Sequence, residues 1–378
     1  MRKVVRHGRT DDAAPDDDDA STRGEFSHVL DSIGCRRQTS YDCAMEPVRF
    51  GVLGAARISG IALYDPARDT GTPLLAIAAR DRRRAEAIAE EVGIPRVYDS
   101  YQDVIDDPEI EAIYNPLPNG LHGPWNLRAI AAGKHVLTEK PFASNTIEAT
   151  LVHDAGVAAG VHVIDAIHYR YHPLRHRMVE LAESGELGDV VAVEATMVMR
   201  PPGDADPRWN ASLAGGSMMD IGMYALHGAR QVAHLLGGEP MVVSAEGGEI
   251  ERHPGTDAWM HATLEYPNGV QAKITSDMTA GHKDFSLRFI GTKGNAYAPA
   301  FVQPWENDTI IVTTEAGQRV EHTSTKTTYL YQLEAFTRLL RLGEAMPTDS
   351  ADAIRQAELI DRCYVLAGMQ PRPVTVLQ

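Results

Sequence analysis

The chain has 378 residues, a net charge of −16 and 43% hydrophobic residues. This length favours two domains over a single core, and the negative charge provides no field that attracts phosphates, so we expect no nucleic-acid partner. The sequence contains neither an apolar run of about eighteen residues nor an apolar segment near the N-terminus, so we expect neither a membrane span nor a signal peptide.

The cysteines are too few and too scattered for a disulfide framework. Cys35 and Cys43 stand near the N-terminus, and Cys363 lies near the other end. This usage is typical of a reducing compartment, and we therefore expect a cytoplasmic protein.

Residues 1–46 are predicted to be a disordered N-terminal extension. The segment contains the run Asp16–Asp19 and has no apolar periodicity, so it cannot bury enough surface to offset its ordering entropy. The globular pattern begins at Val48, just after Met45. We interpret Met45 as the true start of the protein and the preceding residues as a translation artefact, with a genuine acidic tail as the alternative.

Residues 47–165 alternate between short apolar strands and amphipathic helices. This rhythm predicts an α/β fold with a doubly wound parallel sheet, a Rossmann domain that binds NAD(P). The predicted strands are Val48–Gly54, Leu74–Ala79, Val97–Tyr98, Ala112–Tyr114, His135–Thr138 and Val161–Asp165. The predicted helices begin at Ser59 and then cover Arg82–Glu91, Tyr101–Ile105, Trp125–Ala132 and Ile147–Ala159.

Residues 166–378 follow a different pattern, which predicts an α+β domain for substrate binding and oligomerisation. Its large, mostly antiparallel open sheet is indicated by the extended run Val190–Met199 and by a hairpin whose turn is Tyr266–Gly269. Two amphipathic helices follow, over Leu330–Leu342 and Ser350–Ala367, and are candidates to pack back on the Rossmann domain. One face of the sheet is left free to pair with a second copy, so we expect a homo-oligomer.

The segment after the first strand predicts a dinucleotide site. Its small residues let backbone N–H groups approach a pyrophosphate at the start of a helix. The segment departs from the usual G-x-G-x-x-G pattern, because an alanine and Ser59 replace the second and third glycines. The candidate cofactor residues here are Gly54, Ala55, Ala56, Arg57 and Ile58.

The end of the second strand indicates which cofactor binds. An NAD site usually places Asp or Glu there to hold the ribose 2′-hydroxyl, but this chain has Ala79. Arg80 beside it can pair with a 2′-phosphate, which favours NADP over NAD. Two alternatives stay open: Asp81 could face the ribose, or Arg80 could be a solvated residue at the start of a helix.

The triplet Glu139-Lys140-Pro141 follows the strand His135–Thr138. Lys140 would supply a fixed positive charge at the cofactor cleft, and Pro141 would stiffen the turn that aims it. The alternative is an ordinary surface turn, where most lysines lie.

A glycine pair, Gly215-Gly216, precedes a helix that carries Asp220, Tyr224 and His227 at spacings of four and three. These spacings predict a polar stripe on one helix face, and burying such groups without partners is costly. A tyrosine near a lysine ammonium has a lowered pKa and can move a proton, so Tyr224 is a candidate acid–base residue. A satisfied core network is the alternative.

Together these motifs resemble the Gfo/Idh/MocA family of oxidoreductases over about residues 48–375. The resemblance implies that Lys140 orients the substrate oxygen beside the nicotinamide, that Tyr224 exchanges the proton and that Asp220 orients the pair. Because a tyrosine stands where the inositol-dehydrogenase type has histidine, the chain is most similar to the branch that contains dimeric dihydrodiol dehydrogenase and NADP-linked xylose dehydrogenase. The resemblance also implies homodimers or homotetramers.

Two more stretches share this resemblance. Residues 114–122 resemble the stretch along the nicotinamide half of the cofactor, and residues 168–173 resemble a segment that enters the substrate pocket. The resemblance therefore adds as cofactor residues Pro116, Leu117, Asn119, His122, Glu139 and Lys140. It gives as substrate residues Lys140, Arg170, His172, Asp220 and Tyr224.

A zinc site is a rival interpretation of one segment. His168, His172 and His176 are spaced by four, which on a helix could chelate a metal. Pro173 interrupts any helix there, and no cysteine or acid stands at a matching interval. We therefore expect no metal.

We expect a cytoplasmic NAD(P)-dependent oxidoreductase that moves hydride between nicotinamide C4 and a CH–OH carbon of a sugar, polyol or dihydrodiol. The protein would contribute positioning and electrostatics, and the cofactor would perform the redox step. Two alternatives use the same fold. One is a non-catalytic NADP-binding sensor or scaffold, and the other is a glycosidase that retains its cofactor.

Overall fold

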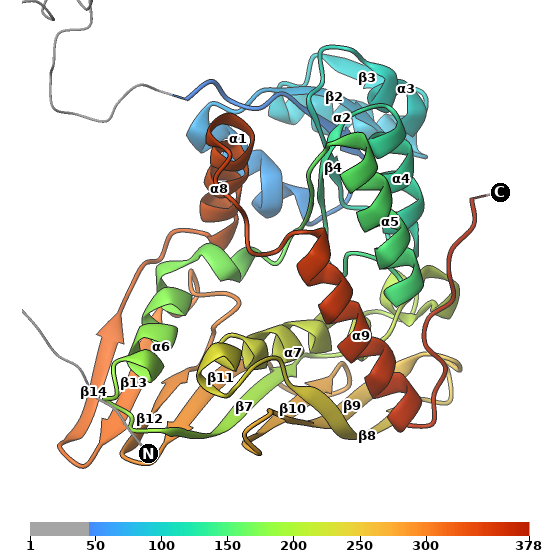
Figure 1. Cartoon of the computed structure of the whole chain (residues 1–378). Coiled ribbons are helices and arrows are strands. Elements are labelled where there is room, and N and C mark those ends of the chain that lie inside the picture. The colour runs from blue at the N-terminus through green and yellow to red at the C-terminus, as the bar shows by residue number, and fades with distance from the viewer. Residues whose placement is uncertain (1–44, 378) are drawn as a thin grey trace, which may run out of the picture. The chain divides into compact units, whose positions relative to one another are not determined.

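The computed structural model describes residues 45–377 (Figure 1). The predicted N-terminal extension, residues 1–46, therefore lies almost wholly outside the described residues. From Met45 onward the chain forms one compact unit, so the boundary expected between residues 165 and 166 stays a prediction. Within the described part of the chain, none of the helices combines the length and apolar character that crossing a membrane requires.

Parallel strands form a first sheet in the order β3-β2-β1-β4-β5-β6. The strands are β1 (Phe50–Leu53), β2 (Leu74–Ala78), β3 (Arg96–Tyr98), β4 (Ala112–Asn115), β5 (His135–Thr138) and β6 (Val163–Asp165). Every residue of β1 and β4 is buried, as expected for strands covered on both faces. The strand order reverses between β1 and β4, and ligands bind at such switch points in doubly wound sheets.

The helices of this half are α1 (Asp65–Thr70), α2 (Arg82–Val92), α3 (Tyr101–Asp106), α4 (His122–Ala131) and α5 (Thr146–Ala159). The helix predicted from Ser59 onward is divided, because a π-helical turn over Gly60–Tyr64 precedes α1. Pro66 at the start of α1 has no N–H to donate, so the two segments cannot share one continuous hydrogen-bond ladder.

The second sheet has the order β14-β13-β12-β11-β7-β10-β9-β8. Its strands are β7 (Val190–Val198), β8 (Met241–Glu249), β9 (Asp257–Glu265), β10 (Gln271–Asp277), β11 (Asp284–Gly291), β12 (Gly294–Ala298), β13 (Thr309–Thr314) and β14 (Gly317–His322). All neighbouring pairs are antiparallel except β7 and β10, which are parallel. The predicted fold class, a Rossmann domain plus a mostly antiparallel open sheet, is confirmed.

One face of the second sheet is covered by α6 (Pro173–Glu183), α7 (Met223–Arg230) and α9 (Ser350–Leu366) (Figure 1). Side chains of these helices and of the inward face of the sheet form one core. The helix α8 (Thr328–Leu342) instead joins the core of the first sheet, where the rings of Phe336 and Phe50 lie 5.6 Å apart. Helix α8, near the end of the chain, thus packs against β1, near the beginning of the described residues.

Candidate active site

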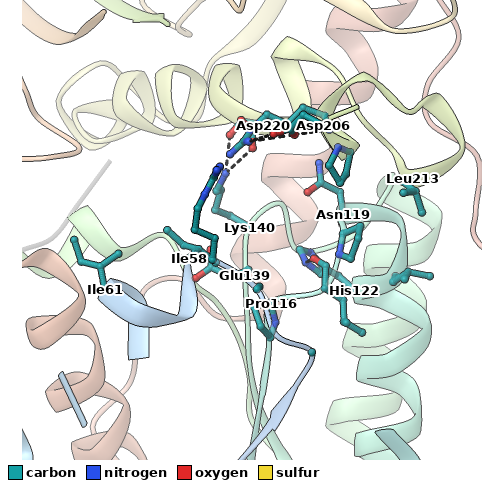
Figure 2. A pocket seen from close by; sticks show the side chains of 18 of the residues that line it. Ile58, Ile61, Pro116, Asn119, His122, Glu139, Lys140, Asp206, Leu213 and Asp220 are labelled. Carbon is teal, nitrogen blue, oxygen red and sulfur yellow. Dashed lines mark hydrogen bonds and ion pairs between the residues drawn. The ribbon is translucent and has the colours of Figure 1, made fainter. Parts of the chain in front are cut away.

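A cavity of about 1070 Å³ opens at the carboxyl ends of β1, β2, β4 and β5. Residues of the second sheet and of the segment before α7 close its other side. Its position is the switch point of the first sheet, and its size exceeds that of a typical small-ligand pocket. Figure 2 shows side chains from both halves of the chain that point into it.

The turn after β1 presents its backbone to this cavity. Gly54 has φ +90°, a left-handed conformation that favours glycine, and a Cβ atom there would lie 3.0 Å from Leu117 Cδ2. The Gly54 N–H donates to the Ala78 carbonyl across 2.6 Å, which fixes the turn against β2. The small side chains of Ala55 and Ala56 also line the cavity. This cradle fits the pyrophosphate of a dinucleotide.

Two arginines lie at the end of the cavity beside β2. Arg80 lines the cavity next to Ala79, and Arg84, one turn into α2, donates to the Ala55 carbonyl across 2.6 Å. The Asp81 carboxylate accepts the Arg83 N–H at 3.1 Å and so caps α2. The arginines give this end of the cavity a positive charge.

The loops after β4 and β5 are tied together by His122. Its ring nitrogens lie 2.6 Å from the Leu117 carbonyl and 2.7 Å from the Pro141 carbonyl. Burial lowers the pKa of His122 to about 4, so the neutral ring donates to one of these two oxygens. Asn119, in the first of these loops, donates to the Ala214 carbonyl at 3.1 Å and so links this loop to the segment before α7.

The loop after β5 carries a buried acid and a lysine. Glu139 accepts a hydrogen bond from the Tyr114 hydroxyl at 2.9 Å, and burial raises the pKa of this carboxyl. Lys140 extends the other way, across the cavity, and its Nζ donates to the Asp220 carbonyl at 2.8 Å and to Oδ1 of the same residue at 3.1 Å (Figure 2). The peptide bond between Lys140 and Pro141 is cis.

Asp220 lies in a π-helical turn, Met218–Gly222, that leads directly into α7. Its second oxygen accepts from Arg208 Nε at 2.5 Å, and the same guanidinium donates to Asp206. Burial alone raises the pKa of Asp220, but the charges of Lys140 and Arg208 outweigh it and hold the pKa at about 2. Asp220 is therefore a permanent anion between two cations.

The absence of a side chain at Gly216 leaves space for a carboxylate that stabilises this turn. Gly216 has φ +132°, and a Cβ there would lie 2.0 Å from Asp257 Oδ1. The other oxygen of Asp257 accepts the Met218 N–H at 2.7 Å. The glycine thus lets a buried carboxylate cap the turn that presents Asp220.

Tyr224 follows Asp220 by one turn. Lys140 Nζ lies 5.2 Å from the centre of its ring, and its hydroxyl lies 2.9 Å from His168 Nε2. The expectation that Lys140 lowers the pKa of Tyr224 is wrong. Burial, together with the neighbouring acidic groups, raises the pKa well above its ordinary value.

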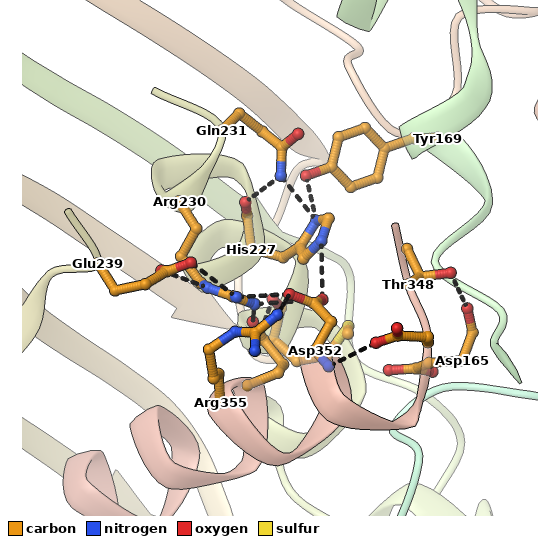
Figure 3. Close-up of polar contacts among 12 residues, drawn as sticks. Asp165, Tyr169, His227, Arg230, Gln231, Glu239, Thr348, Asp352 and Arg355 are labelled. Carbon is orange, nitrogen blue, oxygen red and sulfur yellow. Dashed lines mark hydrogen bonds and ion pairs between the residues drawn. The ribbon is translucent and has the colours of Figure 1, made fainter. Parts of the chain in front are cut away.

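His227 leaves this group and joins a second network inside the molecule (Figure 3). Its Nδ1 lies 2.6 Å from the Tyr169 hydroxyl, and its Nε2 faces Asp352 at 3.7 Å. Asp352 in turn accepts from Arg230 at 2.6 Å. The predicted polar stripe on one helix face is therefore divided between the cavity and the core.

Two comparisons address the family to which this site belongs. The model of an oxidoreductase family with an NAD-binding Rossmann fold matches residues 48–164, and that of the GFO/IDH/MocA C-terminal domain matches residues 176–297. D-xylose 1-dehydrogenase (NADP(+)) 2 of Haloferax volcanii is 37% identical over 318 residues, which cover 83% of this chain and 96% of that relative. This chain belongs to the Gfo/Idh/MocA family.

Two further relatives agree with this assignment. Trans-1,2-dihydrobenzene-1,2-diol dehydrogenase of Mus musculus is 29% identical over 265 residues, which cover 68% of this chain and 77% of that enzyme. A 3-ketoreductase from Actinomadura kijaniata, solved with NADP and TDP-benzene, has a TM-score of 0.76 and 26% identity, and the match covers 84% of this chain and 96% of that chain. The resemblance carried by the motifs is confirmed, and the chain is an NAD(P)-dependent oxidoreductase.

The structure of this Gfo/Idh/MocA enzyme brings most of the predicted site residues to the cavity. The predicted cofactor residues that line it are Gly54, Ala55, Ala56, Arg57, Ile58, Arg80, Pro116, Leu117, Asn119, His122, Glu139 and Lys140. Of the predicted substrate residues, Lys140, Asp220 and Tyr224 line it, whereas Arg170 and His172 do not.

Arg170 and His172 have other surroundings. The His172 Nδ1 accepts the Leu174 N–H at 3.1 Å and caps α6, and its ring packs on Tyr331. Burial lowers the pKa of Arg170, whose charged neighbours include Asp352 of the second network. The described residues 45–377 contain no group of three or more His, Cys, Asp or Glu side chains placed to hold a metal ion.

Several cavity residues of this Gfo/Idh/MocA enzyme escaped the sequence analysis. Arg208 lies in a single 3-10 turn, Pro207–Trp209, which Asp206 caps. So short an element leaves no periodic pattern in the sequence, and no sequence signal marks these two residues. Arg84 could have been found from its place in the first turn of α2, directly after the end of β2. His168 belongs to the stretch 168–173 that resembles a segment of the substrate pocket, and it lines the cavity, but its contact with Tyr224 was not predicted.

Proposed function

We propose that this Gfo/Idh/MocA enzyme transfers hydride between NADP and a CH–OH carbon of a neutral sugar, polyol or dihydrodiol. The observation that carries the proposal is the meeting of the Lys140 ammonium, the Asp220 carboxylate and the Tyr224 ring at one end of the cavity. Relatives named for D-xylose and for a dihydrobenzene diol support this substrate class. When bound, NADP supplies the hydride acceptor or donor.

Tyr224 is the proposed proton carrier. In the oxidative direction the Tyr224 phenolate takes the proton of the substrate hydroxyl, and in the reductive direction the Tyr224 phenol gives its proton to the substrate oxygen. Because burial raises the pKa of Tyr224, the resting group is a phenol, which is the form that donates a proton to a carbonyl.

Lys140 is the proposed binder of the substrate oxygen. An ammonium aimed at that oxygen stabilises the negative charge that develops on it during the reaction. Asp220 fixes the ammonium through two hydrogen bonds, and Arg208 holds Asp220 from the far side. Neither Arg170 nor His172 has a part in this proposal, since neither lines the cavity.

The charge balance supports a neutral substrate. At this end of the cavity the cations Lys140 and Arg208 are matched by the carboxylates Asp206 and Asp220. Among residues 45–377, the side chains that line this end of the cavity leave no surplus positive charge beside Tyr224, so a phosphorylated sugar would gain no compensation for its lost hydration.

Turnover of a substrate panel tests the proposal. Neutral pentoses, hexoses, polyols and dihydrodiols are assayed with NADP⁺ and NAD⁺, each sugar beside its phosphate ester. We expect nicotinamide reduction with a neutral substrate and less with its ester. Preference for the esters would contradict the substrate class. Tight NADP binding without turnover of any of these compounds would instead indicate a sensor or scaffold.

Arg80 is proposed to select NADP. The capping role of Asp81 leaves Arg80 as the charged group beside Ala79, where a 2′-phosphate would lie. Replacing Arg80 by Ala should weaken NADP binding by about 1–3 kcal/mol, the scale of a charge-assisted hydrogen bond, and leave NAD binding nearly unchanged. Calorimetric titration with each cofactor measures both affinities, and equal losses would exclude this role.

We also propose a cytoplasmic homodimer or homotetramer that associates through the second sheet. Exposed apolar side chains on its strands, among them Met241, Val243, Val191 and Val320, support this interface. Sedimentation at micromolar concentration should give an oligomer, and Met241→Lys should shift it towards monomer. A wild-type monomer would contradict the proposal.

A further inference from the structure

The hydroxyl of Tyr224 belongs to a line of three buried polar groups. Tyr224 Oη lies 2.9 Å from His168 Nε2, and His168 Nδ1 lies 2.7 Å from Thr328 Oγ1 at the start of α8. The exposed fractions are 4%, 2% and 0% in the same order. The Tyr329 ring lies 4.0 Å and the Trp305 ring 6.2 Å from the His168 ring, so aromatic groups pack around the imidazole.

The imidazole in this line is neutral. Burial lowers the pKa of His168 well below its ordinary value, and the nearby charge of Lys140 acts in the same direction. A neutral imidazole has one N–H donor and one nitrogen acceptor. It therefore accepts on one side of the line and donates on the other.

The direction of the line follows from the hydroxyl at its far end. Within residues 45–377 the Thr328 hydroxyl has no hydrogen-bond partner other than His168. If His168 donated to Thr328, the proton of that buried hydroxyl would have no acceptor, which costs free energy. With Thr328 as donor, Thr328 donates to Nδ1 and Nε2–H donates to Tyr224 Oη. The proton left over is then that of Tyr224, which lines the cavity and can meet an acceptor there, whereas Thr328 does not line it.

We propose that Thr328 and His168 form a one-way hydrogen-bond chain that fixes Tyr224 as a proton donor into the cavity. This inference rests on the proposed function, and it makes His168 and Thr328 positioning residues that act through Tyr224. Because the phenol oxygen already accepts from His168, its own proton is left to point at the substrate oxygen beside Lys140.

The chemical step balances within this arrangement. In the reductive direction the Tyr224 O–H bond breaks, its proton bonds to the substrate oxygen, and the phenolate left behind keeps the hydrogen bond from His168 Nε2–H. Hydride comes from the reduced cofactor. In the oxidative direction the phenolate takes the proton of the substrate hydroxyl. The donor at Nε2 stabilises the phenolate, so the chain lowers the pKa of Tyr224 relative to the same site without it.

Other charged and titratable groups near the line also affect the pKa values of Tyr224 and His168. Those that act on Tyr224 come from the β5 loop, from β6, from the turn before α7 and from α8, and they are Lys140, Glu139, Asp165, Asp220 and Tyr329. His172, next to α6, acts on His168. None of them is altered in the variants below.

Thr328 offers a clean pair of variants because it does not line the cavity. Thr328→Val removes the hydroxyl donor at nearly constant shape, and Thr328→Ser keeps the donor. The oxidative rate of each is measured against pH. Without the Thr328 donor, the His168 ring is free to carry its proton on Nδ1 and then no longer donates to the Tyr224 phenolate. We expect the acid limb of the Thr328→Val profile to move up by at most about one pH unit, the scale of the His168–Tyr224 hydrogen bond to the charged group. Thr328→Ser should keep the wild-type profile, and KM for the cofactor should stay near wild type in both.

Two results would overturn the chain. One is an identical pH profile for Thr328→Val and Thr328→Ser, with Tyr224→Phe inactive, which would leave the proposed function standing. The other comes from nitrogen NMR of histidine-labelled enzyme, with the His168 signal assigned by its loss in His168→Gln. We expect the Nε2–H tautomer at pH 7, and the Nδ1–H tautomer or an imidazolium would exclude the proposed direction. This second measurement needs no turnover, so it holds even if the substrate class is wrong.

Discussion

Helix α7 and the turn before it contribute residues to two polar networks. The two networks contain similar residue types but have different roles. Around Tyr224 the partners are His168, Lys140 and Asp220. Around His227 they are Tyr169 and Asp352 (Figure 3). Each network pairs a tyrosine with a histidine at hydrogen-bond distance, and each contains an ion pair, partly buried beside Tyr224 and buried beside His227.

The networks differ in where their donors point. The Tyr169 hydroxyl is hydrogen-bonded to His227 inside the core, and Arg230 is bound by Asp352 and Glu239. The polar groups of that network are therefore paired with one another and not with a ligand. Tyr224 and Lys140 line a cavity. A buried ion pair by itself is therefore weak support for a function, and access to a cavity is what separates the site from the core network.

The largest expected effect comes from Tyr224→Phe. This change removes the proton carrier and keeps the ring, so turnover should fall by roughly 10²–10⁴. NADP affinity should stay near the wild-type value, and the free energy of unfolding should fall by about 1–2 kcal/mol, because the change also removes the buried hydrogen bond to His168. Steady-state kinetics, cofactor titration and thermal unfolding on the same preparation check all three.

Tyr169→Phe is the matched change in the closed network. It removes the hydrogen bond to His227 and should lower the free energy of unfolding by about 1–2 kcal/mol while turnover stays within a few-fold of wild type. If the two variants exchanged these outcomes, our division of the networks would be wrong.

Lys140→Ala should lower turnover by a factor similar to that of Tyr224→Phe, because the substrate oxygen loses its cation. The double variant should lose much less than the product of the two factors, since groups that act as a unit are not additive. Multiplied losses in the double variant would mean that the two side chains act independently.

The smallest effect concerns pH and is common to both networks. Burial lowers the pKa of His168 and of His227, so below about 6.5 the unfolded chain binds protons that the folded chain does not. Each histidine therefore stabilises the fold at neutral pH, and this contribution falls by about 1.4 kcal/mol per pH unit below that value. Urea unfolding at pH 7 and pH 5.5 measures the slope, which His227→Gln should reduce. An unchanged slope would show that His227 is charged in the fold.

The strands of the first sheet could be predicted because they are short apolar runs, and some are followed directly by charged residues. Leu74–Ala78 and His135–Thr138 illustrate this pattern. Helix boundaries were harder. We expected a helix from Trp125, but α4 begins at His122 and holds Pro124 in its first turn, where a missing N–H costs nothing.

Lys140, Asp220 and Tyr224 were predictable because each lies in a recognisable motif. Outside such motifs, the sequence could not predict whether a side chain points into the cavity or into the core. Asp220 and Tyr224 both line the cavity, whereas His227 does not. Tyr224 and His227 lie three residues apart in α7, a spacing that turns the second side chain by about 60° around the helix axis, so His227 faces the core. His172 was expected at the substrate, although its place just before Pro173 is typical of a helix cap.

The packing of Phe336 against Phe50 affects how the first sheet can fold during synthesis of the chain. The core of the first sheet is completed by α8, which the ribosome adds after all strands of both sheets. Domains usually fold as units from the N-terminus during synthesis. Here part of the apolar surface of the first sheet stays uncovered until residues 328–342 have been synthesised.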